Sequence, residues 1–127
     1  MIIYILIMYK VHSQMSITAK SPNGKFHADT FECTSQCSTC LFAFVCPCIV
    51  YAQNQAAITN GSSVKDTIIY TIATAIGFQS CIGAYGRGVV RKTRHIEGSF
   101  MTDCLTHLCC TSCALTQERT ELIQASL

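Results

Sequence analysis

The chain has 127 residues, ten cysteines, no tryptophan and two prolines, and only 13% of its residues are charged. A soluble domain carries about 25% charged residues, so a single small domain this poor in charge needs a membrane or covalent staples to bury its apolar surface. The length excludes large enzyme scaffolds. The net charge of +2, without a basic and aromatic surface pattern, gives no ground for nucleic-acid binding.

Residues 1–23 are predicted to be a variable lead-in. They open with the apolar run MIIYILIMY, which is too short to cross a bilayer as a helix. One interpretation is a signal peptide, because Val11 and Ser13 suit the positions before a cleavage site, although no basic residue precedes the run. The other is a translation start at Met15, which would leave residues 1–14 outside the mature protein.

The cysteines form two clusters, residues 33–48 and residues 104–113, with Cys81 alone between them. Each cluster contains a Cys-x-x-Cys pair, and two such pairs supply the four thiolates of a tetrahedral zinc site. Disulfides, metal thiolates and buried thiols that act only as small apolar side chains all stay open from the spacing alone. The candidate metal thiolates are Cys37, Cys40, Cys46, Cys48, Cys109, Cys110 and Cys113, and the weaker candidates are Cys33, Cys104 and His107.

A helix is predicted over residues 47–60, because Pro47 suits the first helical position and Asn60-Gly61 is a typical stop. Cys46 and Cys48 would then lie at its positive N-terminal end, which favours thiolate over thiol. The alternative is a buried proline turn with inert sulfurs. The apolar block at residues 40–52 is too short to span a membrane alone, so we expect it to dip into one or to pack against a neighbouring helix.

Residues 67–86 are a 20-residue stretch without a charge. As one helix it would measure about 30 Å, the thickness of a bilayer core. Its threonines and glycines make it a weak spanning segment, so a buried soluble helix is the alternative. A basic cluster follows, which would mark the cytosolic end of a span or contact anionic lipid headgroups, although a solvated turn would look the same. It consists of Arg87, Arg91, Lys92 and Arg94.

A C-terminal helix is predicted over residues 104–124, with Asp103 as its N-cap, because no proline or glycine interrupts it. The charged residues 117–121 are expected to be solvated. At 100° per residue, three leucines form one packing stripe and three cysteines fall on another face. The leucines are Leu108, Leu115 and Leu122, and the cysteines are Cys109, Cys110 and Cys113.

The first cysteine cluster contains a distinctive motif, in which Cys40-Leu41 precedes Cys46-Pro47-Cys48 by four residues. It resembles the hallmark C-L-x-x-x-x-C-P-C of the placenta-specific gene 8 family, which includes cornifelin, the plant cadmium-resistance proteins and the fruit-weight or cell-number regulators. The resemblance implies a domain over residues 24–122, followed by a short tail at residues 123–127.

Four further segments resemble the family in the same order: residues 85–87, 91–92, 96–107 and 113–118. The last two are similar to its E-x-S-P-C-x-D-C-L-x-H and C-A-L-C-Q-E. The motif residues carried over are Leu41, Pro47, Asp103, Gln117 and Glu118. The chain departs from the pattern with Phe26 in place of a tryptophan, Phe100 in place of a proline, and Met101 and Thr116 in place of cysteines.

The resemblance implies a small protein at the plasma membrane that self-associates, and the positive-inside rule predicts that its basic C-terminal region lies in the cytosol. Plant members are linked to cadmium tolerance, zinc movement and organ size. Zinc or cadmium is therefore the expected ion, bound or transported, with no organic cofactor and no nucleic-acid partner. Family members lack a signal peptide, which favours membrane association over secretion.

The sequence thus predicts a mainly α fold: a small cysteine-rich helical domain with one or two short apolar membrane-associated segments. The leading function is divalent heavy-metal binding, transport or tolerance. The alternative is a regulatory interaction module whose cysteines are structural, and a third interpretation is palmitoylation of cysteines near the membrane. An enzyme is not expected, because no phosphate loop, G-x-S-x-G or H-E-x-x-H motif is present and only a Cys/His nucleophile remains.

Overall fold

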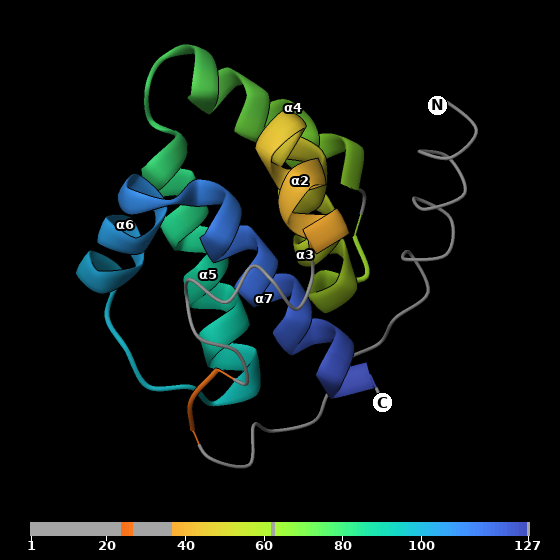
Figure 1. Cartoon of the computed structure of the whole chain (residues 1–127), viewed down its shortest axis with the longest axis vertical. Coiled ribbons are helices and arrows are strands. Elements are labelled where there is room, and N and C mark those ends of the chain that lie inside the picture. The colour runs from red at the N-terminus through yellow and green to blue at the C-terminus, as the bar shows by residue number, and fades with distance from the viewer. Residues whose placement is uncertain (1–23, 27–36, 62, 127) are drawn as a thin grey trace.

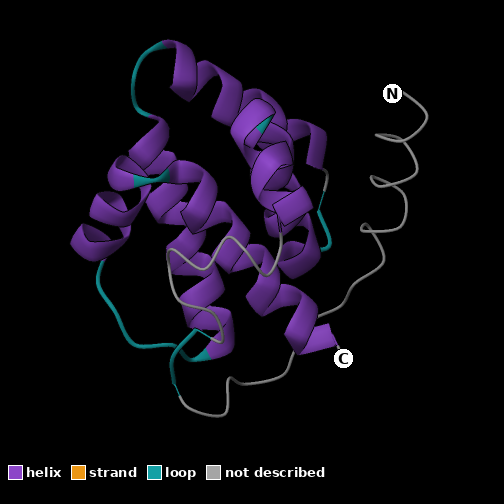
Figure 2. Ribbon diagram, in the orientation of Figure 1, coloured by secondary structure: helices purple, strands orange, loops and turns teal. Residues whose placement is uncertain are grey.

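The computed structural model describes residues 24–26, 37–61 and 63–126. These residues form six helices and no strand (Figure 2), so the predicted mainly α fold is confirmed. The helices are α2 (Cys37–Val45), α3 (Pro47–Thr59), α4 (Ser63–Ala75), α5 (Gln79–Arg94), α6 (Phe100–Cys109) and α7 (Thr111–Ser126).

Helix α7 lies at the centre of the arrangement, because it packs against α2, α3, α5 and α6 (Figure 1). Two apolar clusters hold these helices together. One contains Val50, Tyr51, Tyr70 and Leu115, with the two tyrosine rings 4.7 Å apart between centroids. The other contains Ala57, Val90 and Leu122, with Phe26 packed against it.

Helix α3 confirms the prediction for residues 47–60. Pro47 occupies the first turn, where its missing N–H costs no hydrogen bond. Asn60 ends the helix in the left-handed conformation, with φ 50°, and its backbone N–H donates to the carbonyl of Ala56. The preceding residues form the separate helix α2, which is bent by 117° from α3 across Cys46. A chain reversal at Cys46 is expected, since proline prevents the helix from continuing.

The prediction of one helix over residues 67–86 is wrong. The chain ends α4 at Ala75 and starts α5 at Gln79, with Gly77 between them at φ +83°, a conformation that favours glycine. Within the described ranges no single helix has the length and hydropathy of a membrane span. The bent pair of α2 and α3 reaches those limits by length and composition only.

The prediction of one helix over residues 104–124 is also wrong. Helix α6 begins earlier, with Ser99 as its N-cap, whose Oγ accepts the backbone N–H of Thr102. Asp103 lies in the first turn instead. Cys110 adopts an extended conformation, φ −156° and ψ 92°, and separates α6 from α7. Leu115 and Leu122 are buried as predicted, whereas Leu108 is 67% exposed because it precedes this break.

Glycine allows α5 to approach α6 closely. A Cβ atom added at Gly83 would lie 2.5 Å from Nδ1 of His107, whose ring is buried. A Cβ at Gly88, in the same helix, would have its nearest neighbours at 4.0 Å.

We therefore expect Gly83→Ala to lower the free energy of unfolding by about 1–3 kcal/mol, because the helices must separate. Gly88→Ala is the matched control and should be neutral or stabilising by up to about 1 kcal/mol, the helix-propensity gain of alanine. Urea unfolding followed by circular dichroism measures both. Equal transition midpoints for the two variants would show that the Gly83 contact does not limit the helix spacing.

Candidate functional site

The basic cluster on α5 points into the protein. The spacing Arg87, Arg91 and Arg94 places three guanidinium groups on one helical face, and that face packs against α6 and α7. Arg87 is buried and Arg94 is only 2% exposed. The prediction of a basic membrane-surface cluster is therefore wrong for the arginines, and of its four members only Lys92 is exposed.

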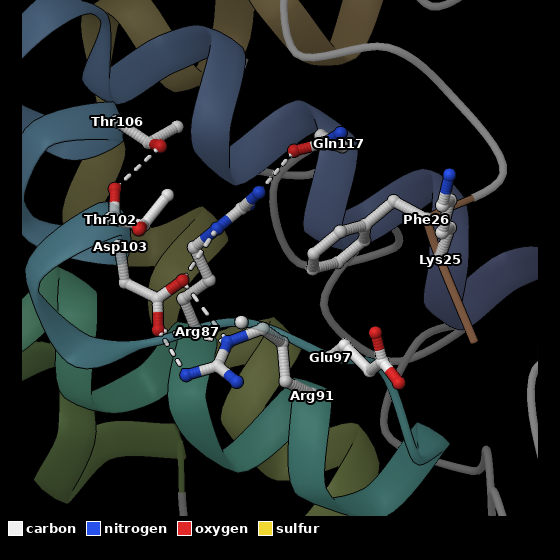
Figure 3. Close-up of a pocket in the computed structure, with 10 residues that line it drawn as sticks. Lys25, Phe26, Arg87, Arg91, Glu97, Thr102, Asp103, Thr106 and Gln117 are labelled. Atoms are coloured by element: carbon white, nitrogen blue, oxygen red, sulfur yellow. Dashed lines mark hydrogen bonds and ion pairs between the residues drawn. The ribbon is translucent and has the colours of Figure 1, made fainter.

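Asp103 on α6 binds two of these arginines (Figure 3). Nη2 of Arg91 donates to Oδ2 at 2.6 Å, and Nε of Arg91 donates to Oδ1 at 3.1 Å and to Oδ2 at 2.9 Å, so both carboxylate oxygens take part in a strong ion pair. Nε of Arg87 also lies 3.3 Å from Oδ1. Asp103 thus joins α5 to α6, so this motif residue has a structural role.

Two motif residues of α7 bind the same arginine. Oε1 of Gln117 accepts Nη2 of Arg87 at 2.5 Å, as Figure 3 shows. Oε1 of Glu118 lies 3.5 Å from Nη1 of Arg87 and 2.9 Å from Nε2 of His107. Glu118 has no exposed surface, and His107 is also buried. The predicted solvation of residues 117–121 is therefore wrong, because Gln117, Glu118, Arg119 and Glu121 are buried.

A second buried ion pair lies one turn further along. Nε of Arg94 donates to Oε1 of Glu121 at 2.9 Å, and both side chains are buried. We call the residues of these two groups, Arg87, Arg91, Arg94, Asp103, His107, Gln117, Glu118 and Glu121, the buried charge network. Each of its three carboxylates accepts a hydrogen bond from arginine or histidine.

A cavity of about 290 Å³ lies beside the network (Figure 3). Lys25, Phe26 and Glu97 line it together with Arg87 and Arg91. The Phe26 ring covers the guanidinium of Arg87, with 4.2 Å between Cζ and the ring centroid, which is a cation–π contact. The backbone N–H of Glu97 donates to the carbonyl of Gly24 and ties this segment to the α5–α6 connection.

The cysteines do not assemble the predicted four-thiolate zinc site. The described part of the chain contains no group of three or more His, Cys, Asp or Glu residues placed to hold a metal ion. Cys110 and Cys113 form a disulfide with each other, and Cys109 is exposed. Cys40 lies in α2, one turn after Cys37, and Cys33 lies outside the described residues.

Two cysteines at the α2–α3 bend keep their predicted place. Cys46 precedes Pro47 and Cys48 follows it, so both lie at the N-terminal end of α3 with half-buried, free thiols. Cys81, isolated in the sequence, is a neighbour of Cys104 in the fold. Burial, followed by this neighbour, raises the pKa of Cys104.

Large apolar side chains lie on the outside of the molecule. The exposed residues of α4 recur at helical spacing, Ile68, Ile72 and Ile76, and those of α6 include Leu105 and Leu108. Phe44, near the end of α2, is 77% exposed. In Figure 1, α4 and the turn into α5 form one edge of the molecule. The remaining members of this apolar exterior are Leu41, Val45, Val64, Ile69, Phe78, Tyr85, Phe100 and Met101.

Comparison with known proteins identifies relatives across most of the chain. Plant Cadmium Resistance 2 of Arabidopsis thaliana is 34% identical over 102 residues, which cover 78% of this chain and 67% of that protein. Plant Cadmium Resistance 1 of the same plant is 34% identical over 104 residues, covering 78% and 68%. Cell number regulator 11 of Zea mays is 29% identical over 119 residues, covering 87% and 75%.

No solved structure matches this chain. The model of the PLAC8 family matches residues 26–121, a range that contains the α2–α3 bend and the whole buried charge network. The chain therefore belongs to the PLAC8 family, the placenta-specific gene 8 family that its cysteine motif indicated.

Proposed function

We propose that this protein is a membrane-associated, self-associating protein that handles divalent soft metals, with zinc or cadmium as its cargo. Its relatives named for cadmium resistance support the metal, at 34% identity. The plasma membrane is the proposed location. The proposal includes no catalytic step and no organic cofactor.

The observation that carries membrane association is the inverted placement of apolar and charged side chains. Among the described residues three arginines and three carboxylates are buried, whereas fourteen large apolar side chains are exposed. Water favours the opposite arrangement, since each buried apolar side chain contributes about 1.5–3 kcal/mol. A bilayer would cover the exposed faces of α2, α4 and α6, because exposed apolar surface of this kind marks a membrane or protein contact.

The proposed metal step uses the thiols at the α2–α3 bend. Cys46 and Cys48 lie beside Phe44 and Val45, which belong to the apolar exterior. Thiolates bind zinc and cadmium well because both metals prefer soft sulfur ligands. Two thiols leave a tetrahedral ion incompletely bound, so bends from more than one chain would complete the ligand set. This requirement supports the proposed homo-oligomer.

The membrane step is tested by flotation with phosphatidylcholine–phosphatidylserine vesicles. The wild-type chain is expected to float, and Ile68→Ser with Ile72→Ser should reduce the floated fraction at least about fivefold, because two exposed isoleucines are lost. Thr67→Ser with Thr71→Ser, in the same helix, is the matched control and should float like the wild type. A wild-type chain that stays in the aqueous fraction would contradict the proposal.

The metal step is tested by cadmium tolerance of yeast cells that express the protein, together with metal content after purification without chelator. Cys46→Ser with Cys48→Ser should abolish the added tolerance and lower bound metal, while membrane association persists. Cys109→Ser removes an exposed thiol outside the bend and serves as control. Equal tolerance in the bend variant would rule out these thiols as ligands.

A second candidate, an interaction module, is favoured by the same apolar exterior, because a protein partner covers such a surface as well as lipid does. It predicts a protein that carbonate washing releases from membranes and whose partner binding does not depend on metal. Extraction by detergent alone would favour the membrane protein.

A further inference from the structure

The connection between α6 and α7 consists of one residue, Cys110, and it forms a disulfide. Its partner is Cys113, in the first turn of α7, with Cα atoms 5.3 Å apart. The extended backbone of Cys110 turns its sulfur back over the start of α7. This helix break occurs without proline or glycine, so the cysteine pair is the distinctive feature of the segment.

The hydrogen bonds around Cys110 make it both the end of α6 and the cap of α7. Its backbone N–H donates to the carbonyl of Thr106 at 3.0 Å, and its carbonyl accepts the N–H of Ala114 at 3.0 Å. The N–H of Cys113 donates to Sγ of Cys110 at 3.3 Å. The Cys110 sulfur therefore lies at the positive end of a 16-residue helix and accepts a backbone N–H, and both features stabilise negative charge on sulfur.

The break also positions the buried charge network. His107 precedes it and Glu118 follows it, and their side chains meet at 2.9 Å although eleven residues separate them. In one straight helix, eleven residues would place them about 16 Å apart along the axis. The His107–Glu118 contact thus requires the break, and the disulfide lies at that same break, so we expect each to stabilise the other.

We propose that Cys110 and Cys113 form a redox-active dithiol–disulfide pair that exchanges with small thiols of the glutathione class. Oxidation of the pair to the disulfide stabilises the break between α6 and α7. Both residues are half-buried, so a small thiol reaches the pair from solvent. An exchangeable pair is distinct from a structural disulfide, which resists reduction by glutathione.

The reaction proceeds through one mixed disulfide. In the oxidising direction, the Cys110 thiolate attacks one sulfur of glutathione disulfide, whose S–S bond breaks and releases one glutathione thiolate. The Cys113 thiol loses its proton to solvent and attacks Sγ of Cys110, releasing the second glutathione thiolate. The dithiol gives up two electrons, glutathione disulfide takes them, and the two released thiolates take up protons. Reduction by glutathione follows the same steps in reverse.

The test uses the full chain in detergent and chelator, so that bound metal cannot mask thiols. The protein is equilibrated at defined ratios of glutathione to glutathione disulfide, quenched with acid, alkylated with N-ethylmaleimide and analysed by peptide mass spectrometry. Cys110 and Cys113 should become alkylated together as the ratio rises. Cys113→Ser should accumulate glutathione on Cys110, at least about tenfold more than Cys110→Ser accumulates on Cys113. Cys109→Ser should exchange like the wild type.

The coupling between the disulfide and the buried charge network is tested by a separate variant. His107→Ala removes the contact that shares the break, so the pair should be reduced at a severalfold lower ratio of glutathione to its disulfide. An unchanged midpoint would overturn the coupling. Alkylation of both thiols even in excess glutathione disulfide, or glutathione trapped on Cys109 instead, would overturn the redox pair. None of these results depends on metal handling or vesicle binding, so the two proposals fail independently.

Discussion

Replacing Asp103 by asparagine is expected to lower the free energy of unfolding by about 3–5 kcal/mol, the usual cost of breaking a buried ion pair. The Asp103 carboxylate binds Arg91 through two donors and also contacts Arg87. Asparagine keeps the shape of the side chain but removes the charge. The guanidinium groups of Arg87 and Arg91 would then lose the carboxylate that they share, and Arg87 is buried.

The expected loss is a large part of the 5–15 kcal/mol that stabilises a typical domain, so Asp103→Asn should be soluble only in part. Urea unfolding at pH 7, followed by helical circular dichroism, measures the change. Glu97→Gln is the matched control, because Glu97 lines the same cavity but is exposed. It should change the free energy of unfolding by no more than about 0.5 kcal/mol. Similar midpoints for the two variants would show that Asp103 contributes little.

Local signals in the sequence were sufficient for α3. Pro47 at its start and Asn60 at its end act through their own backbone conformations, which need no distant partner. The break near Gly77 also had a local signal, because glycine readily adopts positive φ. Charge counting and hydropathy concealed it, since both treat glycine as a neutral residue inside an apolar stretch.

The break at Cys110 and the buried network depended on tertiary contacts. Gly83 faces His107, while Arg87 and Arg91 face Asp103, and this complementary four-residue spacing on the two helices was the available signal. Because charged residues usually face water, Glu118 was expected to be solvated. Only the approach of α5 and α6 to α7 supplies the partners that make its burial favourable.

Candidate metal ligands illustrate the same limit. The spacing of Cys37 and Cys40, or of Cys110 and Cys113, fixes only whether the two members of one pair share a helical turn. Whether two pairs converge depends on how α2 meets α7. In the described residues the pairs do not converge. The motif at Cys46-Pro47-Cys48 was more informative because proline determines the bend locally.

Arg119 differs from the other buried arginines, and this difference predicts that its removal stabilises the folded protein. It is only 3% exposed, and neither Nη1 nor Nη2 has a hydrogen-bond partner. Burial lowers the pKa of Arg119 to about 10, so the fold disfavours its charge. The charged group therefore destabilises the folded state at all pH values below about 10. This penalty declines as the pH rises from 10 toward the ordinary pKa of 12.5.

We expect Arg119→Met to raise the free energy of unfolding at pH 7 by about 1–3 kcal/mol, because an apolar side chain of similar length avoids the cost of the buried charge. Arg94→Met is the matched control, because the buried guanidinium of Arg94 is paired with Glu121. It should lower the free energy of unfolding by about 3–5 kcal/mol, since it takes the cation away from the buried carboxylate of Glu121.

Urea unfolding of both variants at pH 7 and at pH 10.5 tests the assignment. The advantage of Arg119→Met over the wild type should shrink at the higher pH, where wild-type Arg119 is partly neutral in the fold. A loss of stability in Arg119→Met at pH 7 would mean that the folded protein supplies this guanidinium with a favourable contact. Opposite signs for two buried arginines would show that pairing, rather than burial alone, decides whether a charge stabilises this fold.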